Sequence, residues 1–303
     1  WYLQVALGEK FAHQALGNII REIPIRAPRG NIVDRKGRLL ASSRPTYTLC
    51  VIPGEMTSPE ETLSSLAKIL KRPVEELKQI IREKRISNYD PIILQRDLDD
   101  DTYLIIVWRK LLLPGVECRQ DPVRWYPNGK LASLLLGYPG EINQEELSRL
   151  KDEGYRPGDF IGKSGVEKAF ESYLRGQDGA KQLEVNARGH IQQMLGERQP
   201  VPGHTVVLSI DKQLQRAAEE ALGDRVGAAV ALDVRTGEVL AMASRPAFDP
   251  NVFARGIKPE EWNAIINMPT HPLQNRTIHN AYPPGSTFKL ITTVAALESG
   301  SRV

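Results

Sequence analysis

A connector rich in proline and glycine, QPVPGHT at residues 199–205, divides the chain into two parts that differ in their residue patterns. Proline and glycine interrupt helices and strands, so a segment of this kind commonly joins separately folded units. At 303 residues the chain is long enough for about two domains of roughly 150 residues each. We therefore predict a stalk over 1–25, a first module over 26–199 and a second domain over 200–303.

The first part carries both helical and strand patterns, which predicts an α+β fold. Near-helical spacing of apolar residues over 10–23 predicts an amphipathic helix. Over 26–53, short β-prone runs flank the turn sequence DRKG at 34–37, which is the pattern of a hairpin. Asn143 and Glu146 have the spacing of a capping box at the start of a later helix. The elements expected between hairpin and capping box are helices over 59–71 and 73–84, a strand over 91–98 and a helix over 102–113.

The second part has a more regular pattern, beginning with a strand over 205–210 and a helix whose N-cap is Ser209 or Asp211. Two β-prone runs then flank the RTG turn at 235–237, so we expect an antiparallel sheet flanked by helices. An extended, proline-rich passage over 245–284 leads to the sequence YPPGSTFK and a last helix. That helix should bury one apolar face, made of Leu290, Ile291, Val294 and Leu297.

Charge and composition exclude several kinds of protein. The net charge of +3 is the small difference between 40 basic and 37 acidic residues, far from the dense basic surface of a nucleic-acid binder, so we expect no nucleic-acid partner. The five histidines are scattered without metal-ligand spacing, and we expect neither a metal nor a cofactor. Cys50 and Cys118 form no CxxC pair; two buried or partly buried thiols are the favoured interpretation, and one disulfide is the alternative.

The sequence GKS at 162–164 has the last residues of a phosphate-binding loop but not its context. That loop needs a glycine five residues before its final glycine, and Pro157 stands there instead. We also expect no strand immediately before it. The segment 158–179 is therefore predicted to be a turn that leads into an amphipathic helix.

No apolar run reaches the roughly 18 residues that a membrane-spanning helix needs. The sequence opens at Trp1 on the apolar segment WYLQVAL, without a signal peptide. A cut that removed an N-terminal anchor would explain this opening, and so would an arbitrary boundary.

Ser286 and Lys289 stand three positions apart, directly after Pro283, Pro284 and Gly285. On a helix these positions share a face, so the lysine amine can reach the serine hydroxyl. The helix N-terminus would also favour a developing oxyanion. Lys289 accepts the serine proton only when its amine is neutral, which requires burial or a nearby cation. On these residues alone, a serine N-cap followed by a surface lysine is the simpler interpretation.

The context of this pair resembles class B penicillin-binding proteins. PLQNRTIHNAYPPGSTFK at 272–289 is similar to the entrance of their active site, where an NR dipeptide precedes the nucleophile motif YPPGST(x)K. RAPRGNIVDRKGRLLA at 26–41 resembles the signature that opens their N-terminal module. Further segments match in the family's order: GKSGVEKAFESYLRGQDG with EVNARG, LSIDKQLQRAAEEAL, and ALDVRTGEVLAMASRPAFDPN. The resemblance covers nearly the whole chain, and YPPGSTFK is most similar to the elongation-type members.

This resemblance implies a peptidoglycan DD-transpeptidase preceded by an elongated, non-catalytic pedestal module of the dimerisation type. Ser286 would attack the D-Ala-D-Ala bond of a stem peptide, an amine of a second peptide would resolve the acyl-enzyme, and β-lactams would acylate the same serine. Lys289 matches the motif lysine, whose role as the base is disputed in related enzymes. The resemblance also implies one N-terminal membrane anchor, absent here, which makes the stalk over 1–25 membrane-proximal. The catalytic part would then lie on the outer face of the cytoplasmic membrane.

Two departures from the family pattern are visible. The SxN and KTG-type motifs lie downstream in the family and are missing here, so the fragment should lack a complete site and be inactive on its own. Leu134 stands where many relatives carry histidine, which does not disturb the assignment.

Two alternative functions remain. The first is a non-catalytic platform that binds and activates a SEDS-type membrane glycosyltransferase, a role that the family's pedestal is thought to have. The second is a β-lactamase or β-lactam sensor, because STFK also occurs in class D β-lactamases. Those enzymes, however, do not carry a long module that opens with RAPRGNIVDRKG.

Overall fold

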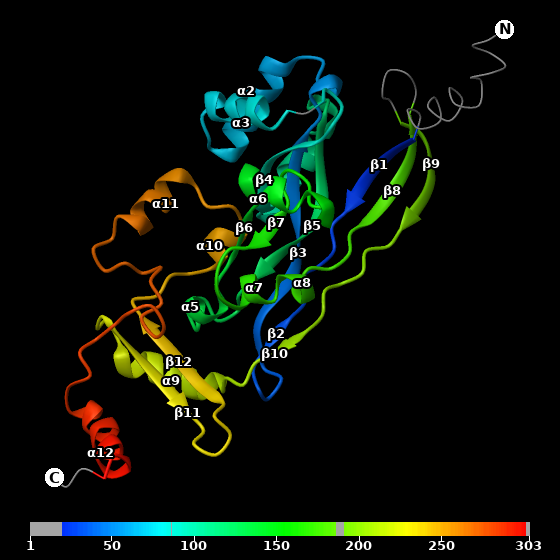
Figure 1. Cartoon of the computed structure of the whole chain (residues 1–303). Helices are drawn as coiled ribbons and strands as arrows, with labels where there is room; N and C mark the ends of the chain where they lie inside the picture. The colour runs from blue at the N-terminus through cyan, green and yellow to red at the C-terminus, as the bar shows by residue number, and fades with distance from the viewer. Residues whose placement is uncertain (1–19, 86, 186–190, 301–303) are drawn as a thin grey trace.

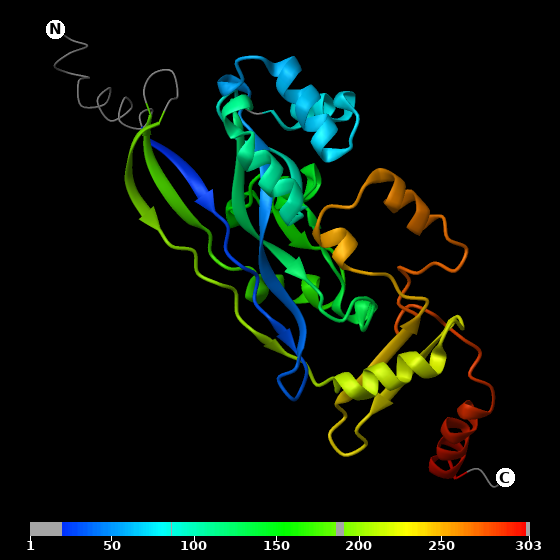
Figure 2. The same ribbon diagram turned by 180° about the vertical axis from the view of Figure 1, so that it is seen from behind.

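The computed structural model describes residues 20–85, 87–185 and 191–300. The described part is elongated (Figures 1 and 2). It contains both helices and mainly antiparallel strands, which confirms the α+β class. The first, larger body of sheets and helices is followed by a smaller unit that contains the candidate nucleophile.

Three strands form an antiparallel arm along one side of the molecule (Figure 1). In spatial order they are β1 (Ile20–Ile25), β8 (Gly179–Val185) and β9 (Ile191–Arg198). The helix predicted over 10–23 is therefore wrong for residues 20–23, which lie in β1; the rest of that prediction falls outside the described residues. The three isoleucines of IREIPI are β-branched residues, which favour strands. The partner of β1 is distant in the sequence, so a local pattern could not reveal the pairing.

A five-stranded sheet forms the centre of the first body, in the order β10-β2-β3-β4, with β5 also paired to β3. The DRKG turn joins β2 to β3: the Gly37 N–H donates to the Asp34 carbonyl at 2.9 Å, and Gly37 has a φ of +74°. The predicted hairpin is confirmed. β10 pairs in parallel with β2 and brings the second part of the chain against the hairpin. The strands are β2 (Ile32–Val33), β3 (Leu39–Val51), β4 (Ile92–Leu98), β5 (Val116–Trp125) and β10 (Val206–Val207).

Helices cover one end of this sheet, close to where the sequence predicts them. Their apolar faces meet β3, β4 and β5 in one core, and each such buried side chain contributes about 1.5–3 kcal/mol. The last helix ends earlier than expected, at Trp108, and a short 3-10 turn completes the segment before Pro114. The elements are η2 (Pro53–Glu55), α2 (Pro59–Leu70), α3 (Val74–Lys84), α4 (Asp100–Trp108) and η3 (Lys110–Leu112).

Short elements connect β5 to β8. The predicted capping box is confirmed, with Asn143 and Glu146 each bonding the other's backbone N–H. A short strand, β7, precedes the GKS sequence, so the expectation of no strand there is wrong; Pro157 still leaves the sequence without the glycine of a phosphate loop. The elements are α5 (Ser133–Leu136), β6 (Pro139–Glu141), α6 (Gln144–Arg149), η4 (Lys151–Glu153), β7 (Phe160–Gly162), α7 (Gly165–Ala169) and α8 (Glu171–Leu174).

A buried ionic cluster surrounds Glu167, whose side chain is 0% exposed. Its carboxylate accepts from Arg124 at 2.5 Å, from Arg29 at 2.8 Å and from the Tyr126 hydroxyl at 3.0 Å. Burial alone would raise the pKa of Glu167, but the two guanidinium groups more than offset it and hold the pKa below 4.5. Arg29 also pairs with Glu171 at 2.8 Å, so the cluster joins the N-terminal segment to α7 and α8.

In the second part, the strand predicted over 205–210 is present only as β10, and α9 follows and packs on the hairpin of β11 and β12. Asp211 caps α9 by accepting from the N–H groups of Gln213 and Leu214, which settles the choice between Ser209 and Asp211. Both β-prone runs around the RTG turn are confirmed as strands. The elements are α9 (Lys212–Leu222), β11 (Gly227–Leu232), β12 (Val239–Arg245), α10 (Asn251–Ala254), α11 (Pro259–Ile266), η5 (Gly285–Phe288) and α12 (Lys289–Glu298).

Charged side chains hold the DRKG turn against the start of α9. Arg38 donates to Asp34 at 2.7 Å and to Asp211 at 2.6 Å, and the Lys212 N–H donates to Asp34 at 3.0 Å. Lys36 also pairs with Asp211 at 2.7 Å. The hydrogen bonds from Lys36 and Arg38 hold the pKa of Asp211 well below its usual range. The two parts of the chain thus meet at a compact ionic joint.

The two cysteines are free thiols, as the favoured interpretation predicts. Cys50 is buried in β3 and Cys118 is half-buried in β5, and burial raises the pKa of each thiol to about 11. Within residues 20–85, 87–185 and 191–300, no helix has the length and hydropathy needed to cross a bilayer.

Candidate active site

Ser286 and Lys289 lie at the junction of two helical segments near the end of the described chain. Ser286 belongs to η5, and α12 begins at Lys289. Gly285 has a φ of +55°, a conformation that favours glycine, and the Thr287 side chain donates to the Pro284 carbonyl at 2.5 Å. The PPGS sequence therefore forms a tight turn that presents the serine at the entrance of the last helix.

Both side chains are exposed to solvent. Within the part of the chain that the structure describes, neither side chain makes a hydrogen bond or ion pair. The structure thus brings Ser286 and Lys289 onto adjacent turns, while no described group buries Lys289. Their assignment as nucleophile and base stays a prediction.

The apolar face of α12 is exposed, which contradicts the expectation that it is buried. Leu290 and Leu297 are each 76% exposed, Ile291 is 61% and Val294 is 57% exposed. The periodicity is correct for a helix with one apolar face, but it does not identify what covers that face. Within the described residues no element packs on it (Figure 2).

A buried dipeptide, Asn275–Arg276, anchors the loop that leads to Ser286. The Arg276 guanidinium donates to the carbonyls of Thr270 at 2.5 Å and His271 at 3.2 Å. The backbone N–H of Arg276 donates to the Ser244 hydroxyl on β12 at 3.0 Å. These bonds fold the proline-rich passage onto the hairpin. The NR pair was singled out in the sequence by resemblance, but its role as a loop anchor was not predicted.

Side-chain amides continue this anchoring toward the nucleophile turn. The Gln274 amide donates to Asn280 at 2.5 Å, and the Asn280 amide donates to the Tyr282 hydroxyl at 2.6 Å. Tyr282 directly precedes the PPGS turn. Sequence reasoning missed Gln274 and Asn280, and no periodic pattern marks them, because a hydrogen bond inside an irregular loop leaves no repeat.

The first body contacts the site region through α5. The side chain of Glu219 on α9 accepts from the Ala132 N–H at 2.7 Å, and Asn275 donates to the Leu134 carbonyl at 3.3 Å. A third link joins Asn251 to the backbone of Tyr126 through two hydrogen bonds, at 2.9 and 3.1 Å. The loop before the nucleophile is therefore held by the first body as well as by its own hairpin.

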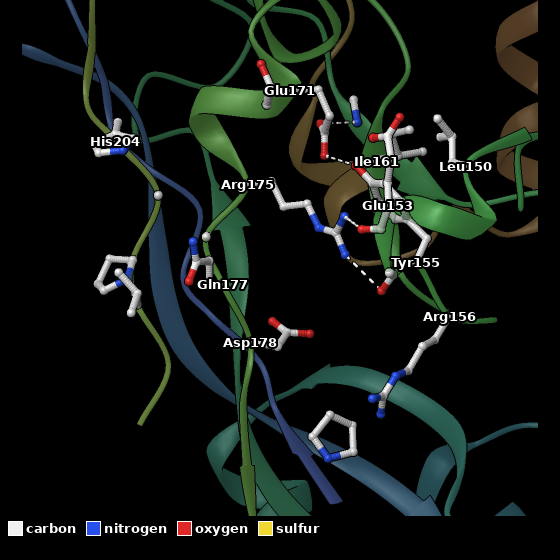
Figure 3. A pocket seen from close by; sticks show the side chains of 18 of the residues that line it. Leu150, Glu153, Tyr155, Arg156, Ile161, Glu171, Arg175, Gln177, Asp178 and His204 are labelled. Carbon is white, nitrogen blue, oxygen red and sulfur yellow. Dashed lines mark hydrogen bonds between the residues drawn. The ribbon is translucent and has the colours of Figure 1, made fainter. Parts of the chain in front are cut away.

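A cavity of about 790 Å³ lies in the first body, far along the chain from Ser286 (Figure 3). Its lining runs from Pro24 to His204 and includes no residue of the second part beyond that point. Among the described residues, no three His, Cys, Asp or Glu side chains are grouped so that they could hold a metal ion.

Two family descriptions match the chain in succession. The penicillin-binding protein dimerisation domain matches residues 24–208, and the penicillin-binding protein transpeptidase domain matches residues 227–302. The second range includes Ser286 and Lys289.

Known proteins agree with these matches. The chain is 34% identical over 300 residues to the peptidoglycan D,D-transpeptidase MrdA of Acinetobacter baumannii, covering 99% of this chain and 45% of that protein. It is 30% identical over 292 residues to penicillin-binding protein 3 of Bacillus subtilis, covering 96% of this chain and 43% of that protein.

The fold is similar to a solved complex between penicillin-binding protein 2 and MreC from Helicobacter pylori, with a TM-score of 0.78 and 27% identity. That similarity covers 92% of this chain and 53% of the solved one. The chain thus spans about half the length of the relatives it matches. With both domains matched in order, the chain belongs to the penicillin-binding proteins in which a dimerisation domain precedes a transpeptidase domain.

Proposed function

We propose that the protein containing this chain is a peptidoglycan DD-transpeptidase of cell elongation, with Ser286 as its nucleophile. The observation that carries the proposal is the transpeptidase-domain match over 227–302, which places the SxxK pair inside the matched range. The relatives named peptidoglycan D,D-transpeptidase MrdA, aligned along almost all of this chain, support the same reaction.

In this proposal the Ser286 oxygen attacks the carbonyl carbon of the D-Ala-D-Ala peptide bond. The serine proton passes to a base, for which Lys289 is the candidate, and the terminal D-Ala leaves as the amine that receives a proton. The amine of a second stem peptide then attacks the acyl-enzyme and restores the serine. A β-lactam acylates the same oxygen, but its opened ring stays attached and blocks the acceptor.

Exposure of Lys289 limits what the described residues contribute to this step. A lysine acts as a base only in its neutral form, which burial or a neighbouring cation favours. The described residues leave Lys289 exposed, so the proposal requires further groups to complete its surroundings. The exposed apolar face of α12 supports such a completion, because a helix face of four large apolar side chains is stable when another element covers it.

Labelling with a fluorescent penicillin tests the assignment in the full-length protein. Ser286→Ala should abolish covalent labelling because no oxygen remains to be acylated. Ser299→Ala, which removes a hydroxyl at the C-terminal end of α12, should label like the wild type. Labelling retained by Ser286→Ala would overturn the proposal, and rapid release of the label from the wild type would favour a β-lactamase.

We also propose that the first body is a binding platform for a membrane partner at the outer face of the cytoplasmic membrane. The end of α4 and η3 exposes a run of apolar side chains: Trp108 is 87%, Leu111 is 98% and Leu112 is 78% exposed. Contiguous exposed apolar residues of this kind commonly mark protein interfaces, where tryptophan is a frequent anchor. The solved relative is a complex with MreC, and a SEDS-type glycosyltransferase is the partner implied by the sequence resemblance.

Cross-linking in membranes separates these partners. Trp108→Ala combined with Leu111→Asp should reduce capture of the true partner, whereas Val234→Asp, at a 97% exposed position in the second part, should not. Loss of the MreC homologue alone would identify that partner, and loss of the glycosyltransferase alone would identify the other. Unchanged capture of both would contradict a platform at α4.

A further inference from the structure

The cavity in the first body lies where the three-stranded arm leaves the remaining elements. Figure 3 shows its lining residues approaching from both sides: Arg175, Gln177 and Asp178 lie on one side, and Arg156 lies on the other. The Arg175 side chain points across toward Tyr155. Its volume of about 790 Å³ is in the range of small-molecule sites.

Three of the acidic side chains that line the cavity are already neutralised. Glu146 pairs with Lys163, and Asp178 pairs with Arg26 at 3.2 Å. Glu171 pairs with Arg29 at 2.8 Å and also accepts from the Tyr155 hydroxyl and the Gly162 N–H. These carboxylates have little capacity left for a cationic ligand.

Three cations that line the same cavity form no ion pair among the described residues. The side chains of Arg149, Arg156 and Lys168 make no hydrogen bond or ion pair within that part of the chain, and each is exposed. Of the lining acids, Glu153 alone lacks a cationic partner within that part of the chain. The uncompensated charge of the cavity is therefore positive, and a recess concentrates such a field.

Arg175 is held in the middle of the wall. Its guanidinium lies over the Tyr155 ring at 3.5 Å from the centroid and donates to the carbonyls of Glu153 at 3.0 Å and Gly154 at 3.2 Å (Figure 3). The side chain is thereby fixed in position. A fixed guanidinium offers a preorganised contact to a planar or tetrahedral anion at low entropic cost.

The backbone around the cavity is also closely packed. A Cβ on Gly179 would meet the Arg198 carbonyl oxygen at 2.1 Å, and one on Gly176 would meet that of Val201 at 2.4 Å. The segments 176–179 and 198–201 at the base of the arm are therefore closely packed against each other.

We infer that this cavity is a binding site for an organic anion that carries two or more phosphate or carboxylate groups. Arg149, Arg156 and Lys168 neutralise it from the rim, and Arg175 presents the fixed guanidinium. The site lies in the dimerisation domain and is separate from Ser286.

Calorimetric titration of the full chain at low salt tests this inference, with tripolyphosphate and a tri-glutamate peptide as probes. One variant combines Arg149→Gln, Arg156→Gln and Lys168→Gln. A matched variant combines Lys68→Gln, Lys110→Gln and Arg216→Gln, which removes the same three charges from exposed positions outside the cavity. Both replace exposed side chains, so both should fold.

We expect at least one probe to bind, the cavity variant to weaken that binding by about tenfold or more, and the matched variant to weaken it by less than about twofold. Anionic vesicles of cardiolipin, whose headgroup carries two phosphates, and neutral vesicles of phosphatidylcholine separate the sources. Capture by the anionic vesicles that the cavity variant loses would identify a lipid headgroup, and probe binding without capture would identify a soluble anion. Equal weakening by both variants, or no binding of either probe or of the anionic vesicles, would overturn the inference.

Discussion

Glu167 is a carboxylate with no exposed surface. A buried carboxylate is stable only when cations and hydrogen-bond donors offset the cost of removing its charge from water. Here Arg29, Arg124 and Tyr126 supply these interactions. One nitrogen of Arg124 is nevertheless buried without a hydrogen-bond partner. Removing the carboxylate charge would leave the buried Arg124 without a carboxylate partner among the described residues, while Arg29 would keep its pair with Glu171.

Glu167→Gln should therefore destabilise the first body by about 3–5 kcal/mol, the cost of breaking a buried ion pair from one side. Glu238→Gln, which breaks the exposed pair with Arg35, should cost less than about 1 kcal/mol. Urea unfolding followed by circular dichroism measures both. Similar losses in the two variants would contradict a special role for the buried cluster.

The same residue predicts a pH dependence. Because the folded-state pKa of Glu167 lies below the ordinary value of 4.5, its stabilising effect is complete above that value and is lost as the pH falls through the folded-state pKa. The wild type should therefore lose its stability advantage over Glu167→Gln below about pH 4.5. An advantage that stays constant down to acid unfolding would count against this account.

At the scale of elements, sequence patterns correctly predicted the turns and caps that depend on interactions between residues close together in the sequence. The DRKG hairpin, the capping box at Asn143 and the hairpin about the RTG turn depend on neighbours in the sequence, and all three are present. The strand β1 was missed because its partner β8 lies far along the chain. The burial of α12 was wrongly expected because periodicity specifies a face and not its partner.

The helix caps offer a prediction at this scale. Asp99 caps α4 by accepting from Thr102, whereas Asp211 caps α9 and also pairs with Lys36 and Arg38. Asp211→Ala should therefore lower the melting temperature clearly more than Asp99→Ala, because it removes a cap and the ionic joint together. Equal shifts in thermal unfolding would show that the joint adds nothing to the cap.

At the scale of the whole molecule, the contacts of α5 connect the first body to the nucleophile loop. Asn275 donates to the Leu134 carbonyl and also fixes the Thr277 hydroxyl at 2.5 Å. The resemblance identified Ser286, Lys289 and the NR dipeptide in the sequence. It did not supply the loop anchors or the α5 contacts, because these depend on the packing of segments distant in sequence.

Asn275→Ala should slow acylation of the full-length protein by a fluorescent penicillin by up to about tenfold, the effect of losing one or two neutral hydrogen bonds. Asn263→Ala, at an exposed position of α11, should leave the rate unchanged. The second-order acylation rate constant, measured beside the melting temperature, separates a positioning effect from simple unfolding. An unchanged acylation rate constant in Asn275→Ala would show that this loop contact does not position the nucleophile.

The length of β3 has a mechanical consequence. This strand has 13 residues, and at about 3.3 Å per residue it extends roughly 40 Å. Leu49 and Val51 lie in the core beneath α2 to α4, while Leu40 and Ala41 lie in a second core beside the DRKG turn. β3 is therefore a single strand that is buried in one core near each of its two ends. A force applied to α2, α3 or α4 would therefore be transmitted along β3 to the Arg38–Asp211 joint and to α9, instead of bending the first body.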